Sequence, residues 1–196
     1  QLRLSSKSHW DVQVRAPGGV IHVLASHPTP PAFDGPEKRN VARNHDEIRF
    51  WTEYLSPGTH DWLCDDAGRC GGLEPDARFV ILGDLNNDPV DGAGDHTAIV
   101  ELLEHPRVIR MATPRSEGAI DAAEADGGAN AQHRGAAAHD TGSFGPRVGN
   151  LRLDYALPSV GHALVGNGVF WTRSDAAHAD IVDGTDHRLV WVDVTQ

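Results

Sequence analysis

Residues Val80–Gly92 read V-I-L-G-D-L-N-N-D-P-V-D-G, and the rest of the chain is organised around them. The apolar run Arg78–Leu82 has the composition of a buried strand, and it ends at Gly83. Asp84 and Asn86 follow two residues apart, so they lie on the same side of an extended backbone. A carboxylate and an amide together suit a hard cation or a phosphate, whereas the alternative is a strand that ends in an Asx-type turn.

The composition is that of an ordinary globular protein, and residues 1–196 are expected to form a single domain. The formal net charge of −11 argues against broad, non-specific attraction to a polyanion. Bound divalent cations would reverse that sign locally, so a phosphorylated substrate remains possible. No apolar run approaches the roughly 18–20 residues that a membrane span requires.

The two cysteines, Cys64 and Cys70, lie close together in C-D-D-A-G-R-C. Gly68 lies within this short loop, so a disulfide is sterically plausible. A pair of metal-ligating thiols is the alternative, but no second Cys/His pair stands at zinc-site spacing. The disulfide is therefore favoured, and with it a secreted or periplasmic location.

Alternating and apolar segments predict an α/β chain. The expected strands are Trp10–Arg15, Val20–Ser26, Arg78–Leu82, Val108–Met111, Leu151–Leu157, Ala163–Trp171 and Leu189–Val194.

Two helices are expected between these strands. The first is Pro36–Leu55, whose charged residues, Glu47 among them, are expected on solvated or sheet-edge faces. The second is Asp95–Glu104, capped by Asp95. The Gly- and Ala-rich residues 113–150 show no clear pattern and are expected to form a long loop, either functional or mobile.

Further polar side chains lie at strand edges or within strands. His27 follows the second strand, and Asp186 and His187 precede the last one. Asp154 lies inside an apolar strand, where a buried charge would need a partner. With the carboxylate and amide after the central strand, these groups supply what phosphoryl-ester hydrolysis needs. Oxygen ligands hold a cation, an imidazole moves a proton, and an aspartate orients that imidazole.

In this order and with these flanks, the chain resembles the endonuclease/exonuclease/phosphatase superfamily of metal-dependent phosphoesterases. That superfamily includes pancreatic-type deoxyribonucleases, abasic-site endonucleases, bacterial sphingomyelinases and inositol-polyphosphate 5-phosphatases. The matching stretches are S-H at Ser26–His27, G-D-L-N at Gly83–Asn86, R-L-D-Y-A-L-P-S at Arg152–Ser159 and T-D-H-R at Thr185–Arg188.

The resemblance implies catalytic roles for the matched residues. Asp84 would bind or polarise the attacking water, and Asn86 would hold a phosphate oxygen or the metal. His187 would be the catalytic imidazole, and Asp154 would fix its tautomer and orientation. His27 would donate to the phosphate or to the leaving oxygen. Whether His187 or Asp84 is the general base stays open.

The implied cofactor is Mg²⁺, with Mn²⁺ or Ca²⁺ as alternatives. The candidate metal ligands are Asp84, Asn86, Asp186 and His187.

The resemblance covers only the later part of the superfamily's domain. Its early Asn and its early Glu, a principal metal ligand, have no counterpart before Leu24. The chain is therefore expected to supply the C-terminal half of a four-layer α/β/β/α sandwich. One sheet face would then be apolar and uncovered, and an N-terminal segment or a companion chain is expected to complete the fold.

The leading hypothesis is a secreted phosphoesterase that attacks a phosphodiester or phosphomonoester in line with an activated water. The substrate is either a small ester or nucleic acid, and an extracellular nuclease is one specific alternative. An inactive half-domain that serves as a binding or structural remnant is another. A zinc hydrolase would need three converging ligands, and the spacing of the 12 histidines offers no such set.

Overall fold

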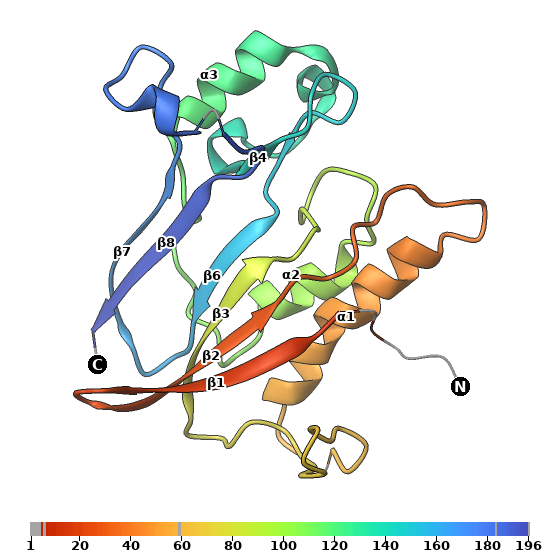
Figure 1. Cartoon of the computed structure of the whole chain (residues 1–196), viewed down its shortest axis with the longest axis vertical. Helices are drawn as coiled ribbons and strands as arrows, with labels where there is room; N and C mark the ends of the chain where they lie inside the picture. Colours follow the sequence, from red (N-terminus) through yellow and green to blue (C-terminus); the bar gives the residue numbers. More distant parts are fainter. Residues whose placement is uncertain (1–4, 6, 59, 183, 196) are drawn as a thin grey trace.

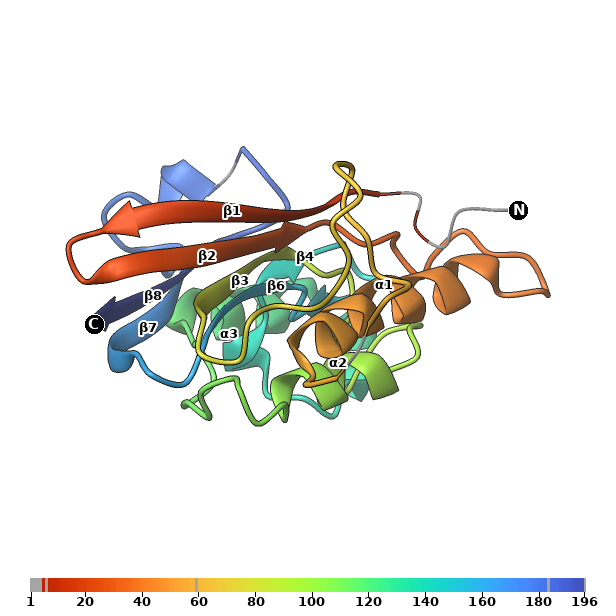
Figure 2. The same cartoon turned by 90° about the horizontal axis from the view of Figure 1, so that it is seen from below.

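The computed structural model describes residues 5, 7–58, 60–182 and 184–195 of the chain. These residues form a mixed α/β fold in which α1 and α2 lie on one side of a β-sheet (Figures 1 and 2). Within the described residues, no helix combines the length and the apolar character that crossing a bilayer would demand.

The elements follow one another in the order β1–β2–α1–β3–α2–α3–β4–β5–β6–β7–β8. The strands are β1 His9–Ala16, β2 Gly19–Ser26, β3 Arg78–Asp84, β4 Gly142–Ser143, β5 Asn150–Leu151, β6 Asp154–Pro158, β7 Ala163–Phe170 and β8 Leu189–Thr195. The helices are α1 Arg39–Leu55, α2 Thr97–Leu103 and α3 Glu117–Asp126, with 3₁₀ turns at Gly128–Gln132, Ala137–His139 and Ala179–Val182.

The main sheet has the strand order β1-β2-β3-β6. The hairpin β1–β2 is antiparallel, β2 and β3 are parallel, and β3 and β6 are antiparallel. A parallel pair needs a crossover connection, and α1 provides it between β2 and β3. Strands β7 and β8 form a separate antiparallel pair, and β8 lies beside β6 (Figure 1).

The main core lies between α1, α2 and the sheet. The apolar face of α1 follows helical spacing and contributes Ile48, Trp51 and Leu55, which are fully buried. They pack with buried residues of β2 and β3, including Leu24 and Phe79. The strands predicted at Trp10–Arg15, Val20–Ser26 and Arg78–Leu82 are confirmed as β1, β2 and β3. The strand predicted at Leu151–Leu157 is divided, because β5 pairs with β4 in a separate sheet and β6 begins at Asp154.

Helix α1 differs from the prediction at both its start and its charged faces. It begins at Arg39 instead of Pro36, and the carboxylate of Asp34 accepts the N–H groups of Asn40 and Val41 in its first turn. The solvated placement of Glu47 was wrong, because its exposed fraction is 0%. Its carboxylate instead accepts the backbone N–H of Thr29, at the end of the loop that carries His27.

The prediction for residues 113–150 was wrong in part, because this segment contains α3, two 3₁₀ turns, β4 and β5. Ser116 caps α3 by accepting the N–H of Ala119. Helix α3 packs through Ala119 against Val169 and Trp171.

The expected strand Val108–Met111 is reduced to one bridge between Val108 and Ser159. The expected disulfide between Cys64 and Cys70 is present.

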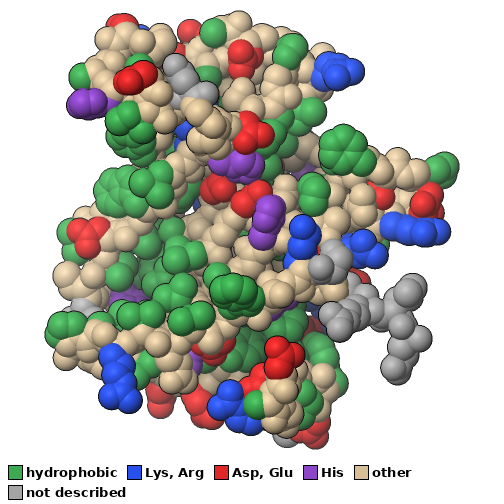
Figure 3. Space-filling view, in the orientation of Figure 1, with side chains coloured by type: hydrophobic (Ala, Val, Ile, Leu, Met, Phe, Trp, Pro, Cys, Tyr) green, Lys and Arg blue, Asp and Glu red, His purple; other side chains and the backbone are tan. Residues whose placement is uncertain are grey.

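The sheet face opposite α1 and α2 is apolar and open. Side-chain alternation directs Trp10, Val12 and Val14 of β1 toward it, with exposed fractions of 62%, 46% and 44%. Leu82 of β3 continues this surface, and 37% of it is exposed. Figure 3 looks onto this side and shows hydrophobic side chains gathered over the strands. We call these four residues the open face.

Gly83 is expected to tolerate no side chain. Its φ is +152°, and a Cβ built there would lie 2.1 Å from the carbonyl oxygen of Ser26 on β2. Gly83→Ala should therefore lower the free energy of unfolding by about 2–4 kcal/mol, because β2 and β3 must separate locally. Urea unfolding followed by tryptophan fluorescence measures this loss. Gly184→Ala is the matched control, since a Cβ there meets nothing within 4 Å. It should change stability by less than about 0.5 kcal/mol, and equal losses in the two variants would contradict the prediction.

Candidate active site

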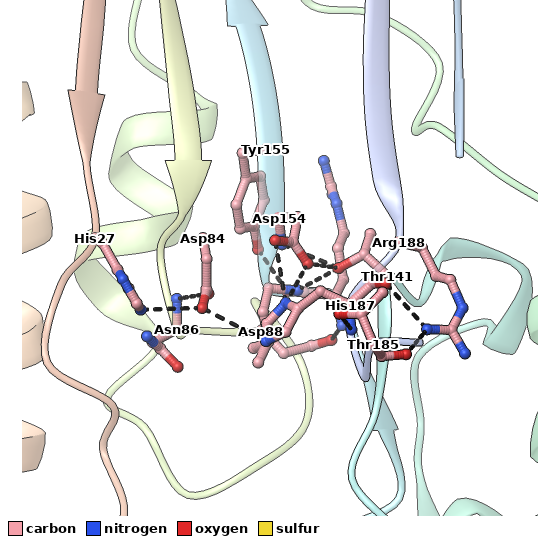
Figure 4. Close-up of polar contacts among 12 residues, drawn as sticks. His27, Asp84, Asn86, Asp88, Thr141, Asp154, Tyr155, Thr185, His187 and Arg188 are labelled. Atoms are coloured by element: carbon pink, nitrogen blue, oxygen red, sulfur yellow. Dashed lines mark hydrogen bonds and ion pairs between the residues drawn. The ribbon is translucent and has the colours of Figure 1, made fainter. Parts of the chain in front are cut away.

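The register between β3 and β6 places two carboxylates directly opposite each other. Asp84 pairs with Asp154, and Leu82 pairs with Ala156 two residues further along. Because side chains alternate, both carboxylates project on the same side of the sheet as Leu82. Like charges directly opposite on neighbouring strands repel, so this pair requires cationic groups nearby. Figure 4 shows that two histidines approach it.

Asp84 lies between two imidazoles. Its Oδ2 is 3.3 Å from Nε2 of His27 and 3.7 Å from Nε2 of His187 (Figure 4). Its Oδ1 accepts the backbone N–H of Asn86 at 2.8 Å. Asn86 adopts a φ of +53°, and its side-chain amide donates to the carbonyl oxygen of Pro28. The segment after β3 is thereby tied to the segment that carries His27.

His187 is held by Asp154 from the opposite side. Its Nδ1 lies 2.9 Å from Oδ2 and 3.2 Å from Oδ1 of Asp154. The ring of Phe144 meets the imidazole edge-on, with the ring centroids 5.4 Å apart. The hydroxyl of Thr141 donates to Oδ2 of Asp154 at 2.7 Å. The residues predicted as the imidazole and its orienting aspartate therefore lie together, with a threonine behind them.

No local sequence pattern indicated Thr141 or Phe144. Both lie in the segment expected to be a loop, and only the fold brings that segment beside His187. Asn44 and Glu47 of α1 were missed as well, although a signal existed. Asn44 lies four residues before Ile48, so it belongs to the apolar face of the helix.

These two buried polar residues support the loops of the site. The amide of Asn44 donates to the carbonyl oxygens of Thr29 and Leu85, at 2.9 and 3.0 Å. Its oxygen accepts from the side-chain amide of Asn87 at 2.7 Å. With Glu47 bound to Thr29, helix α1 fixes both the loop after β2 and the loop after β3.

The ionisation of the two central groups is shifted in the same direction. Burial, reinforced by the negative charge of Asp154, raises the pKa of Asp84 above its ordinary value. Burial alone would lower the pKa of His187. The hydrogen bond to Asp154 and the charges of Asp154 and Asp84 outweigh it and raise that pKa. The site therefore favours a protonated His187 and makes Asp84 a stronger proton acceptor.

Asp84, Asp154 and His187 could together hold a metal ion. Each offers one ligand atom, and among the described residues these three atoms lie within 4.8 Å of one another. Two carboxylates and an imidazole fit a divalent cation such as Mg²⁺ or Mn²⁺. Asp186, the remaining predicted carboxylate ligand, is exposed and adjacent to His187 but does not belong to this group.

A groove of about 530 Å³ lies next to these groups, on the open side of the sheet. Its walls include Trp10, Ala25 and Leu82, and His27 and Asp84 line its end. Figure 3 shows acidic and histidine side chains next to the hydrophobic surface on this side of the molecule. The predicted site residues thus lie where the apolar face meets the polar strand ends.

The sequence matches the model of the Endonuclease/Exonuclease/phosphatase family over residues 5–187. Among solved structures, an endonuclease/exonuclease/phosphatase from Beutenbergia cavernae DSM 12333 is similar with a TM-score of 0.55 and 19% identity. That likeness covers 96% of this chain and 39% of that chain, and it shows a shared fold.

Sphingomyelinase C from Streptomyces griseocarneus is a further match, with a TM-score of 0.47 and 15% identity. It covers 95% of this chain and 54% of that one. The chain therefore spans well under two thirds of either solved protein. A search among curated proteins gave no significant match.

Asp140 precedes Thr141 and forms a second acidic group with Asp88 and Asp91. Asp140 is buried, with 8% of its surface exposed. Burial, together with the charges of Asp88 and Asp91, raises its pKa to about 7. The folded protein therefore holds a proton here that the unfolded chain releases near pH 4. The stability that Asp140 contributes is complete below pH 4 and is lost as the pH rises toward 7.

Asp140→Asn should remove this loss. The variant is expected to gain about 1–3 kcal/mol of unfolding free energy over the parent at pH 8, and much less at pH 4.5. Urea unfolding at the two pH values measures the difference. Asp193→Asn, at an exposed position of β8, is the control and should show no such pH-dependent gain. An equal effect of Asp140→Asn at both pH values would contradict the assignment.

Proposed function

The chain belongs to the endonuclease/exonuclease/phosphatase family, and from this membership we propose that it is a secreted, metal-dependent phosphoesterase. It hydrolyses phosphodiester or phosphomonoester bonds by in-line attack of an activated water. The observation that carries the proposal is the meeting of Asp84, Asp154 and His187, from three different strand ends, with ligand atoms within 4.8 Å.

His187 is the imidazole that moves a proton. Its Nδ1 donates to Asp154, so the ring has one orientation and Nε2 faces Asp84. The raised pKa of His187 favours the protonated form, which stabilises negative charge on a phosphoryl oxygen at Nε2. Asp154 stabilises this imidazolium and does not itself touch the substrate.

Asp84 and His27 supply further polar groups around the phosphorus. The carboxylate of Asp84 orients the attacking water, and either Asp84 or His187 takes its proton. Nε2 of His27 lies 3.3 Å from Oδ2 of Asp84, and the ring is largely exposed, so a phosphoryl or leaving oxygen has access to it. Asn86, fixed to Pro28 by its amide nitrogen, holds a phosphate oxygen or contributes to the metal site.

Asp84 and His187 are the ligands common to the family resemblance and to the geometry of the site, and His187 would bind a cation through Nε2 only in its neutral form. Asn86 and Asp186 are the further ligands that we propose. These residues would hold a divalent cation, Mg²⁺ being the first choice, and the cation would supply positive charge for the phosphoryl oxygens and make a nearby water more acidic. The donor set of carboxylates and one imidazole supports this choice.

The acidic balance favours a small phosphate ester over a long duplex. The net charge of −11 opposes broad attraction to nucleic acid, and the basic residues are scattered and form no continuous run along the sequence. An extracellular nuclease remains the specific alternative. Secretion is supported by the disulfide between Cys64 and Cys70, since such bonds persist in oxidising compartments.

The open face supports a second part of the proposal. The chain forms the C-terminal half of a four-layer α/β/β/α sandwich, and a further segment, on the same or a companion chain, packs on this face. Exposed apolar side chains at Trp10, Val12, Val14 and Leu82 favour a covering partner. The short span relative to the solved structure, 39% of that chain, agrees with it.

Activity toward two synthetic esters tests the catalytic proposal. We expect hydrolysis of bis(p-nitrophenyl) phosphate or p-nitrophenyl phosphate with Mg²⁺, and loss of that hydrolysis with a chelator. Asp84→Ala and His187→Ala should each lower kcat by about 10²–10⁴-fold. His22→Asn is the matched control, because it breaks another His–Asp pair, with Nδ1 2.7 Å from Oδ1 of Asp11, away from the site. An inactive parent chain would favour the alternative of a binding or structural remnant.

The covering partner is tested by the behaviour of the purified chain. We expect it to bind a hydrophobic fluorescent dye and to self-associate in sedimentation velocity, because the open face is apolar. The pair Val12→Lys and Val14→Lys should reduce both effects. Val165→Lys, at an exposed valine of β7, is the control and should change neither. A stable, active monomer of 21.1 kDa that binds no dye would contradict the proposal.

A further inference from the structure

We propose that Thr141 is a positioning residue for the Asp154–His187 pair. The inference rests on the proposed function, in which His187 moves a proton and Asp154 orients it. Among the hydrogen bonds of the described residues, the hydroxyl of Thr141 donates to the carboxylate of Asp154, at 2.7 Å from Oδ2. It therefore acts on His187 through Asp154.

The hydrogen bonds of Thr141 fix the direction in which its hydroxyl hydrogen donates. A hydroxyl has one hydrogen to donate and two lone pairs to accept. The backbone N–H groups of Leu153 and Asp154 donate to Oγ1, at 2.9 and 3.0 Å. Both accepting positions are thereby filled, and the hydrogen is directed at the carboxylate of Asp154. Thr141 is 1% exposed, so water has no access to replace it.

The backbone of Thr141 joins the two segments that carry the pair. Its N–H donates to the carbonyl oxygen of Leu151, at 2.9 Å, on the approach to β6. Its carbonyl oxygen accepts the N–H of Arg188, at 2.8 Å, immediately after His187. The next residue, Gly142, forms an antiparallel bridge with His187. Thr141 is therefore held on both sides, and its side chain sets Asp154 relative to His187.

The consequence is a fixed carboxylate. Oδ2 of Asp154 receives Thr141 from one direction and Nδ1 of His187 from another. Asp154 also lies opposite Asp84, whose charge repels it. A carboxylate in this position would turn away from Asp84 unless a donor held it. The hydroxyl of Thr141 is a donor of this kind in addition to Nδ1 of His187, and it helps to keep Asp154 bonded to the imidazole.

The test uses the full chain and two substitutions that differ by one group. Thr141→Val keeps the shape and removes the hydroxyl, whereas Thr141→Ser keeps the hydroxyl. Under conditions where both variants are folded by circular dichroism, Thr141→Val should lower kcat by about 10–100-fold. Its KM should stay within about twofold, because no substrate contact is lost. Thr141→Ser should recover kcat to within about threefold of the parent.

A spectroscopic readout keeps this test independent of activity. The imidazole N–H proton of His187 that is bonded to Asp154 should give a downfield proton NMR signal, assigned by its loss in His187→Ala. The signal should persist in Thr141→Ser and should broaden or disappear in Thr141→Val. An unchanged signal and an unchanged kcat in Thr141→Val would overturn the inference. If the parent is inactive but the signal follows this pattern, the proposed function fails and the positioning role stands.

Discussion

Two carboxylates face each other across neighbouring strands, and the arrangement of the site follows from that one constraint. Asp84 and Asp154 are paired by register, so no side-chain motion within the sheet can separate them fully. Their repulsion is offset by His187, which lies between them, and by His27 on the far side of Asp84. Burial and the negative charge of Asp154 raise the pKa of Asp84. Burial lowers the pKa of His187, but the hydrogen bond to Asp154 and the charges of both carboxylates outweigh it and raise that pKa. The two carboxylates cannot move apart because their strands are hydrogen-bonded to each other. A site of this kind therefore attracts a cation.

Holding the opposed groups in place requires rigid loops, and α1 supplies that rigidity from beneath. Asn44 and Glu47 are buried polar residues of α1, and the other buried residues of this helix, Ile48, Trp51 and Leu55, are apolar. Buried polar groups cost free energy unless they are hydrogen-bonded, and here they satisfy backbone groups of two loops that cannot satisfy themselves. The loop with His27 and the loop with Asn86 are thus positioned by a single helix. The core and the site are therefore coupled, because the helix that contributes Trp51 and Ile48 to the core also fixes the loops that carry His27 and Asn86.

The sequence predicted the strands of the sheet and the polar residues at their ends, because both depend on local pattern. Arg78–Leu82 is apolar and Asp84 follows its end, so chemistry and position are read from adjacent residues. Helix α3 escaped prediction because it is short and its apolar residues form only a weak helical pattern, and its packing on Val169 and Trp171 depends on distant residues. Thr141 escaped for the same reason. Its importance arises from bonds to Asp154 and Arg188, which no local pattern encodes.

The open face and the site are one continuous surface, which links the two parts of the proposed function. Along β3, Val80, Leu82 and Asp84 alternate onto the same side, so the apolar row ends directly at the carboxylate of Asp84. Polypeptide that covered Leu82 would remove water from one side of Asp84 and strengthen its interactions with both histidines. The strand ends would remain open, since His27 and Asp84 follow Ala25 and Leu82, the last apolar pair of β2 and β3. Completion of the fold would in this way confine the substrate to the edge of the sheet, where Asp84, His27 and His187 converge.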